Sequence, residues 1–242
     1  MGCKWSEVQI LSPRPIKTIG YKNGEAANAA FLLNGDMKTQ SLPLFPLNVV
    51  IFPEGLLPLK IFEMRYLDMV RNCLRNHSRF GVVAVLDDAP STRQDTQLPF
   101  ALVGTSVNII DADTPQTGLM MIRCLGQKRF QVKSAEQQQD GLWIGEVEEI
   151  ENDTNLPIPD DLVTTSDNLH QLIHSLGKQG VPEIDLPIMQ PYQFDDCGWV
   201  ANRWCELLNI PLMQKQRMLE LDSPLVRLEL INDMFHSKQQ NS

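Results

Sequence analysis

Two hydrophobic periods follow one another along the chain. Between residues 41 and 150, short apolar runs alternate with polar turns and predict strands at 80–86, 103–110, 118–125, 129–133 and 143–150. Between residues 160 and 238, apolar residues recur at helical spacing instead. The stretch 151–159 contains Asn, Asp, Thr and two prolines, which is typical of a linker. The pattern therefore predicts an α+β protein in which a β subdomain precedes an α-helical bundle subdomain.

One helix is predicted inside the β subdomain, directly after the opening strands. Its apolar positions recur every three or four residues, at Phe62, Tyr66, Met69 or Val70, and Cys73. Charged residues occupy the opposite face, as expected of an amphipathic helix of about four turns. Several short strands with one inserted helix favour a small, partly closed barrel.

The helical subdomain shows the end signals of four helices. The first helix carries an apolar stripe between Leu162 and Leu176, and the second is expected after Asp195-Asp196, whose carboxylates suit a helix amino terminus. Proline at a first-turn position opens the third helix at Pro211 and the fourth at Pro224. These helices predict a small bundle.

Residues 42–66 form an apolar segment that four prolines interrupt. Each proline lacks an amide donor, so this segment cannot be one helix or a central strand throughout. Strand alternation should turn some apolar side chains outward, and exposed apolar patches usually mark contact sites. The candidate contact residues are Phe45, Phe52, Leu56 and Leu57. The sequence equally allows the carboxy-terminal helices or the amino-terminal leader to cover them.

The segment 42–66 closely resembles the opening of the amino-terminal, substrate-binding domain of Lon proteases, especially its stand-alone bacterial versions. The resemblance continues in the motifs at 80–86, 103–105, 126–130, 215–220 and 227–229, which follow in the expected order. It implies a barrel of the pseudouridine-synthase-and-transglycosylase (PUA-like) type at 41–150, a linker at 151–159 and helices at 160–238, together one Lon amino-terminal-like domain.

The same resemblance implies a function. In Lon the chemistry is carried by other domains, so the expected function is a non-catalytic module, in protein quality control, that binds unfolded or flexible polypeptide segments. A protease or a chaperone is a candidate partner. The alternative is a nucleic acid or nucleotide bound by the β subdomain, by analogy with other PUA-like folds. The net charge of −9 argues against that alternative, because binding to phosphates needs clustered Lys and Arg.

Cysteine usage and hydropathy indicate the compartment. Five cysteines are scattered without the spacing of a zinc ribbon or a disulfide framework, which fits the reducing cytoplasm. No apolar run approaches the roughly 20 residues that span a bilayer. The first six residues match an N-myristoylation pattern with Cys3 beside it, but the resemblance to bacterial proteins favours no membrane anchor. Residues 1–40 are expected to be a poorly ordered leader, with Met37 as an alternative start.

The sequence shows no motif for catalysis or for a cofactor. Neither a phosphate-binding GxxxxGK[ST] loop nor a GxSxG elbow is present. His170 and His174 have zincin spacing, but Gln171 stands where the general-base glutamate is needed, so a surface pair is expected. Asp111 and Asp113 are expected in a hairpin loop. Arg129 is expected to brace carboxylates or carbonyls while Phe130 fills the core.

Overall fold

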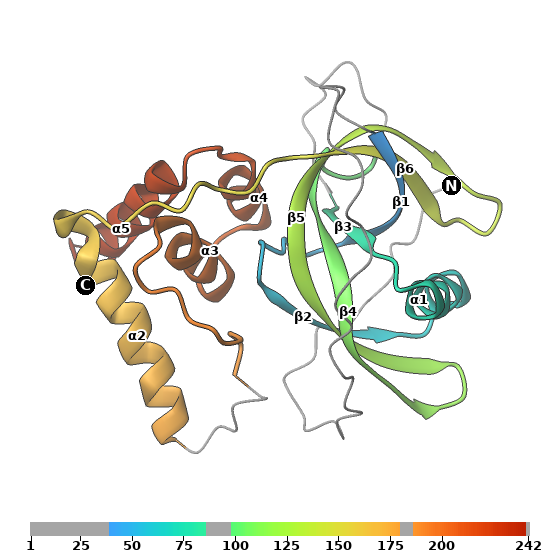
Figure 1. Ribbon diagram of the computed structural model, residues 1–242, viewed down its shortest axis with the longest axis horizontal. Helices are drawn as coiled ribbons and strands as arrows, with labels where there is room; N and C mark the ends of the chain where they lie inside the picture. Colours follow the sequence, from blue (N-terminus) through green and yellow to red (C-terminus); the bar gives the residue numbers. More distant parts are fainter. Residues whose placement is uncertain (1–38, 86–97, 180–185, 241–242) are drawn as a thin grey trace, which may run out of the picture.

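The computed structural model describes residues 39–85, 98–179 and 186–240. A ring of strands and a group of helices lie side by side in it (Figure 1). Thr39 and Gln40, the last two residues of the predicted leader, already belong to the first strand. The rest of the leader, the Met37 start and the myristoylation pattern fall outside the described residues.

The six strands within the described residues form one sheet that partly closes into a barrel. The sheet order is β2-β5-β4-β3-β1-β6, and an additional pairing of β5 with β6 closes the ring. The long β5 serves both ends, because its first half pairs with β2 and its second half with β6. The two strands predicted at 118–125 and 129–133 are therefore a single strand. The bounds of the strands are β1 Thr39–Leu47, β2 Leu56–Ile61, β3 Phe80–Ala84, β4 Val103–Gln116, β5 Leu119–Gln137 and β6 Trp143–Glu149.

Strand β1 accommodates two prolines because it changes partner halfway along. Pro43 is opposite Ile144 of β6, whereas Pro46 is opposite Val83 of β3, and the partners exchange at Leu44. Each proline therefore has a paired strand on one side only. No ladder exists on its other side, so the missing amide costs no hydrogen bond there.

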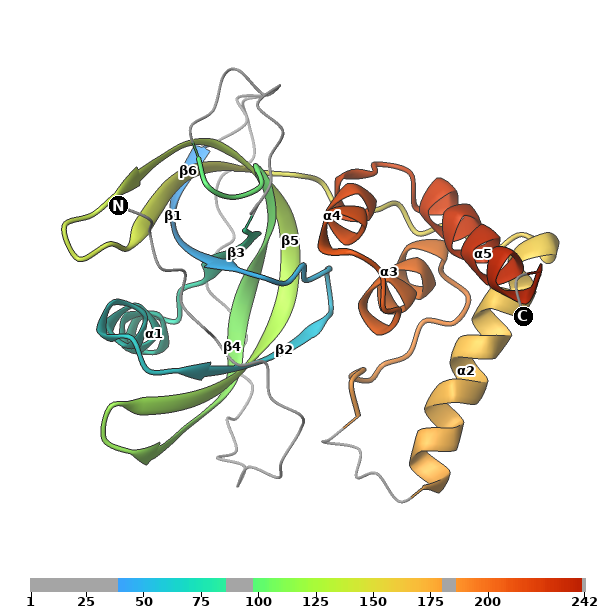
Figure 2. The ribbon, with the colours of Figure 1, turned by 180° about the vertical axis from the view of Figure 1, so that it is seen from behind.

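Helix α1 (Met64–Asn76) covers the barrel on the side away from the other helices, as Figures 1 and 2 both show. It buries the predicted stripe of Tyr66, Met69, Val70 and Cys73. The prediction for Phe62 is wrong, because Phe62 is 48% exposed. It follows the inward-facing Ile61 at the end of β2, and strand alternation turns it outward.

The carboxy-terminal helices begin where the capping residues predict. The Asp196 carboxylate accepts a hydrogen bond of 2.7 Å from the Trp199 amide at the start of the third helix. Pro211 and Pro224 open the next two helices. No helix within the described residues is long and apolar enough to cross a membrane. The bounds are η1 Asp160–Leu162, α2 Val163–Lys178, α3 Cys197–Leu207, α4 Leu212–Glu220 and α5 Pro224–Gln240.

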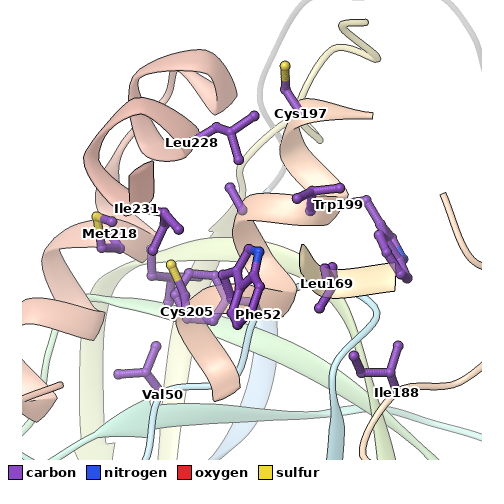
Figure 3. Packing of buried hydrophobic residues seen from close by; sticks show 14 of the residues in the cluster. Val50, Phe52, Leu169, Ile188, Cys197, Trp199, Cys205, Met218, Leu228 and Ile231 are labelled. Atoms are coloured by element: carbon purple, nitrogen blue, oxygen red, sulfur yellow. The ribbon is translucent and has the colours of Figure 1, made fainter. Parts of the chain in front are cut away.

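The barrel and the helical bundle share one hydrophobic core. From the barrel, Val50, Phe52 and Val103 pack with Cys205 and Met218 of the helices. Figure 3 shows Phe52 lying beside Cys205 at the centre of this cluster. Two further clusters fill the interior of the barrel and the contact with α1. Because the core crosses from strands to helices, the two parts stabilise each other by burial of apolar surface.

Candidate functional site

The structure separates the four residues predicted to form an exposed apolar contact surface. Phe45, Phe52 and Leu57 are buried, so the expectation of exposure is wrong for these three. Phe45 stacks on Tyr66 of α1, and Phe52 lies in the core shared with the bundle. Leu57 faces inward on β2, whereas Leu56 is half-buried on the outward face. The carboxy-terminal helices cover the segment at Phe52, which is the second alternative that the sequence allowed.

The turn at residues 52–55 is held to the bundle by two charged side chains of α3. Arg203 Nη2 donates to the Pro53 carbonyl at 2.6 Å, and Glu206 Oε1 accepts from the Phe52 amide at 3.2 Å. The two side chains also form an ion pair at 3.1 Å. A Cβ atom at Gly55 would lie 1.8 Å from Glu206 Oε1, so only glycine allows this approach. We call this contact the turn clamp.

Glu206 makes the turn clamp sensitive to pH. Burial raises the pKa of the Glu206 carboxyl from its ordinary value of 4.5 to about 7, although Arg203 and the Phe52 amide oppose this shift. A carboxyl group whose pKa is raised in the folded protein contributes stability that is fully present below its pKa in the unfolded chain. That stability is lost as the pH rises through the pKa of the folded state.

We expect the free energy of unfolding of the wild type, measured relative to that of Glu206→Gln, to fall as the pH rises from about 4.5 to about 7. The fall should be no more than about 3 kcal/mol and should end above neutrality. Urea melts across this pH range measure it. The control is Glu146→Gln, the same change of charge on the exposed face of β6, away from the turn clamp. A difference for Glu206→Gln that does not fall across this pH range would contradict the prediction.

A buried ionic network ties the linker to both parts of the molecule. Asp153, which lies between β6 and η1, contacts Arg227 Nη1 of α5 at 2.5 Å and Arg129 Nη2 of β5 at 3.2 Å. Both guanidinium groups are buried, and burial lowers the pKa of Arg129 while Asp153 opposes the change. Arg129 also donates to the carbonyls of Leu219 and Leu221. The prediction that Arg129 braces carboxylates and carbonyls is therefore confirmed, and Phe130 lies in the barrel core as predicted.

A cleft of about 430 Å³ opens at the junction of barrel and bundle. Its barrel wall is formed by Pro53 and Glu54 of the turn and by residues 125–128 of β5. Its other wall is formed by the linker, Gln193 and the start of α3. The β5 backbone can come this close to the turn because residue 126 is glycine. A Cβ atom there would lie only 2.2 Å from the Phe52 carbonyl oxygen. The turn clamp and the ionic network thus both adjoin the cleft.

Carboxamide side chains make up half of the polar lining of the cleft, and charged side chains make up the other half. The carboxamides are Gln127, Asn152, Asn155, Gln193 and Asn202. Each carboxamide offers both donor and acceptor groups. The cations at the cleft, Lys128 and Arg79, both pair with Glu149, at 2.8 and 3.8 Å. Leu125 adds an apolar contact and is paired with the half-buried Leu56 of β2. The cleft therefore suits a ligand rich in neutral hydrogen-bonding groups.

The other candidate sites lie apart from this cleft. His170 and His174 are exposed on α2, with ring centroids 6.4 Å apart, and the His170 ring centroid lies 4.8 Å from that of Phe194. Within the described residues no group of three or more metal-ligating side chains comes together. Asp111 and Asp113 lie in β4, so their predicted hairpin loop is wrong; the turn follows Gln116, with Gly118 at a φ of 80°.

Sequence reasoning missed Asp153, Arg203 and Glu206. Asp153 was assigned to the linker, where exposed polar residues are the ordinary expectation. Arg203 offered a usable signal, since it stands within the apolar face of α3 between Trp199 and Trp204. A charged residue at such a position is rarely buried without a partner.

A partly closed barrel packed on a helical bundle, with a polar cleft at their junction, defines an α+β protein of two interlocked parts. A family model described as the ATP-dependent protease La (LON) substrate-binding domain matches residues 41–237. This chain belongs to that family.

Solved structures agree with the family match. The chain is similar to a Lon N-terminal domain protein from Xanthomonas campestris, with 32% identity, a TM-score of 0.63 and coverage of 80% of this chain and 98% of that one. The N-terminal domain of the Mycobacterium avium complex Lon protease shares the fold at 15% identity and a TM-score of 0.53, covering 80% of this chain and 97% of that one. No curated protein matches the chain.

Proposed function

We propose that this protein binds segments of unfolded or flexible polypeptide in the cleft between barrel and bundle, without catalysing a reaction. The observation that carries the proposal is the carboxamide lining of that cleft in a member of a substrate-binding family. An extended polypeptide presents an amide donor and a carbonyl acceptor at every residue. Asn and Gln side chains can pair with both main-chain groups whatever the side chains of the bound segment are, which supports recognition of many sequences.

Apolar contacts beside the carboxamides would add affinity. Leu125 lines the cleft, and its cross-strand partner, the half-buried Leu56, lies next to it on β2. Strand β2 also ends the order of strands in the described sheet, so its outer edge is where an extended segment would add by β-augmentation. Of the four predicted contact residues, Leu56 is the one that we retain in the proposed site.

A nucleic-acid ligand is a weaker candidate for the same cleft. Affinity for nucleic acid comes mainly from Lys and Arg contacts to phosphates. Lys128 and Arg79 already share the carboxylate of Glu149, and the chain has a net charge of −9. The charge around the cleft thus favours polypeptide.

The non-catalytic part of the proposal rests on the family and on the thiols. The Lon substrate-binding domain is a non-catalytic module in its family. Burial raises the pKa values of Cys73, Cys197 and Cys205, the last to about 12, so these groups remain thiols rather than nucleophilic thiolates. We place the protein in the cytoplasm, in protein quality control, with a protease or chaperone as partner.

The test fills the cleft with a large side chain. Asn155 is an exposed residue of the cleft wall, and Asn155→Trp should weaken binding to a fluorescent, permanently unfolded polypeptide at least about tenfold, because the indole occupies ligand volume. Fluorescence anisotropy gives the Kd, and an RNA oligonucleotide forms a second titration.

The matched control is Asn72→Trp on the exposed face of α1, on the far side of the barrel. It adds the same indole and should leave the Kd unchanged. Unchanged or tighter polypeptide binding by Asn155→Trp would reject the cleft, and preferential RNA binding that Asn155→Trp abolishes would favour the nucleic-acid alternative.

A further inference from the structure

The turn that forms the barrel wall of the cleft holds a glutamate in a backbone conformation that usually requires glycine. The Gly55 amide donates to the Phe52 carbonyl at 3.0 Å, which closes a four-residue turn with Pro53 at its second position. Glu54, at the third position, has a φ of 63°. A turn of this kind favours glycine there, because a Cβ atom makes the left-handed conformation costly.

The surroundings of Glu54 hold this conformation in place. The Glu54 amide donates to the Gly126 carbonyl at 2.9 Å, and the turn clamp fixes the residues on its amino-terminal side. Strained residues persist where neighbouring contacts determine them, and they cluster at sites of function. The carboxylate at this position is therefore the feature that needs an explanation.

Glu54 supplies a negative charge to the cleft without a cation beside it. Its Oε2 accepts a hydrogen bond of 3.0 Å from Gln193 across the cleft, and no cation of the described residues lies within ion-pair distance. The other carboxylates that line the cleft are satisfied. Asp153 contacts two guanidinium groups, and Asp196 accepts from the amides of Trp199 and Leu156.

We propose that Glu54 makes the cleft select polypeptide segments that carry a lysine or arginine side chain. The proposal rests on the proposed function and adds a specificity to it. A carboxylate has room for several acceptor contacts, so Glu54 can retain Gln193 while it accepts a charge-assisted hydrogen bond from the ligand cation. The carboxamides hold the main chain of the ligand, and Glu54 places one basic side chain at the turn.

The experiment compares two fluorescent peptides that are unstructured and identical except for one central residue, lysine or glutamine. The wild type should bind the lysine peptide about tenfold more tightly, and this preference should fall as salt is added. Glu54→Gln keeps the size and shape of the side chain and should abolish the preference. Glu54→Gly should also abolish it while leaving the melting temperature unchanged or higher, since glycine suits the turn.

The matched control is Glu146→Gln, the same change of charge on exposed β6, which should keep the full preference. If the wild type binds both peptides equally and Asn155→Trp weakens both, the specificity is wrong and the proposed function stands. A preference that survives in Glu54→Gln also rejects the proposal, because the cation then binds elsewhere. If neither peptide binds, or Asn155→Trp affects neither, the proposed function itself is rejected, and the specificity with it.

Discussion

Replacing Asp153 with alanine should lower the free energy of unfolding by about 3–5 kcal/mol. The carboxylate is the anionic partner of Arg227, which is 1% exposed, and of Arg129, which is 4% exposed. Its removal leaves two buried guanidinium groups whose remaining ion-pair partner among the described residues is the exposed Asp222, 3.9 Å from Arg129. Urea denaturation followed by circular dichroism measures the loss.

The matched control removes a second carboxylate near Arg129, one that is exposed to solvent. Asp222 lies 3.9 Å from Arg129, but its side chain is 94% exposed. Asp222→Ala should therefore change stability by no more than about 0.5 kcal/mol. If Asp153→Ala and Asp222→Ala lose the same small amount, the buried network has no special role in holding the linker to the two parts.

Phe52→Ala should lower the free energy of unfolding by a similar amount, about 3–5 kcal/mol, for a different reason. The ring is 0% exposed and lies in the core between barrel and bundle, so truncation leaves a cavity at their junction. Because the turn clamp holds the same residue by its amide, we expect the whole transition to shift as one unfolding event. The melting temperature and the urea midpoint both report this.

Phe62 is the control, since it has the same side chain at 48% exposure. Phe62→Ala should stay within about 0.5 kcal/mol of the wild type. Two separate transitions in Phe52→Ala would contradict this expectation, because barrel and bundle would then unfold independently once the Phe52 ring is removed. A Phe52→Ala variant as stable as the wild type would show that the Phe52 ring contributes little to the shared core.

Local pattern was sufficient for most of the secondary structure. The helix starts at Asp196, Pro211 and Pro224 depend on capping and on proline geometry, which act within a few residues. The buried stripe of α1 follows from spacing alone, apart from Phe62. Local pattern could not predict that β5 is one continuous strand, because the polar residues after Gly126 resemble a turn. Its continuity is evident only from the pairing of β5 with β2, β4 and β6.

The candidate site was less accessible to sequence reasoning, because its residues come from distant parts of the chain. Glu206 and Phe52 are 154 positions apart, and Asp153 and Arg227 are 74 apart. A carboxylate in a linker and an arginine in a helix are ordinary surface residues until tertiary packing removes water from both. The same packing buried Phe45, Phe52 and Leu57, whose apolar character predicted contact without identifying the partner.

The sequence by itself determined the α+β class, the order of the elements and the likeness to Lon substrate-binding domains. These depend on periodicity, caps and short motifs, each readable within a few residues. Only the tertiary structure decided which apolar residues form the core, which charges pair, and where a cleft remains. Those properties arise where β5, the turn at 52–55 and α3 meet, and burial there sets both the pKa of Glu206 and the surroundings of Glu54.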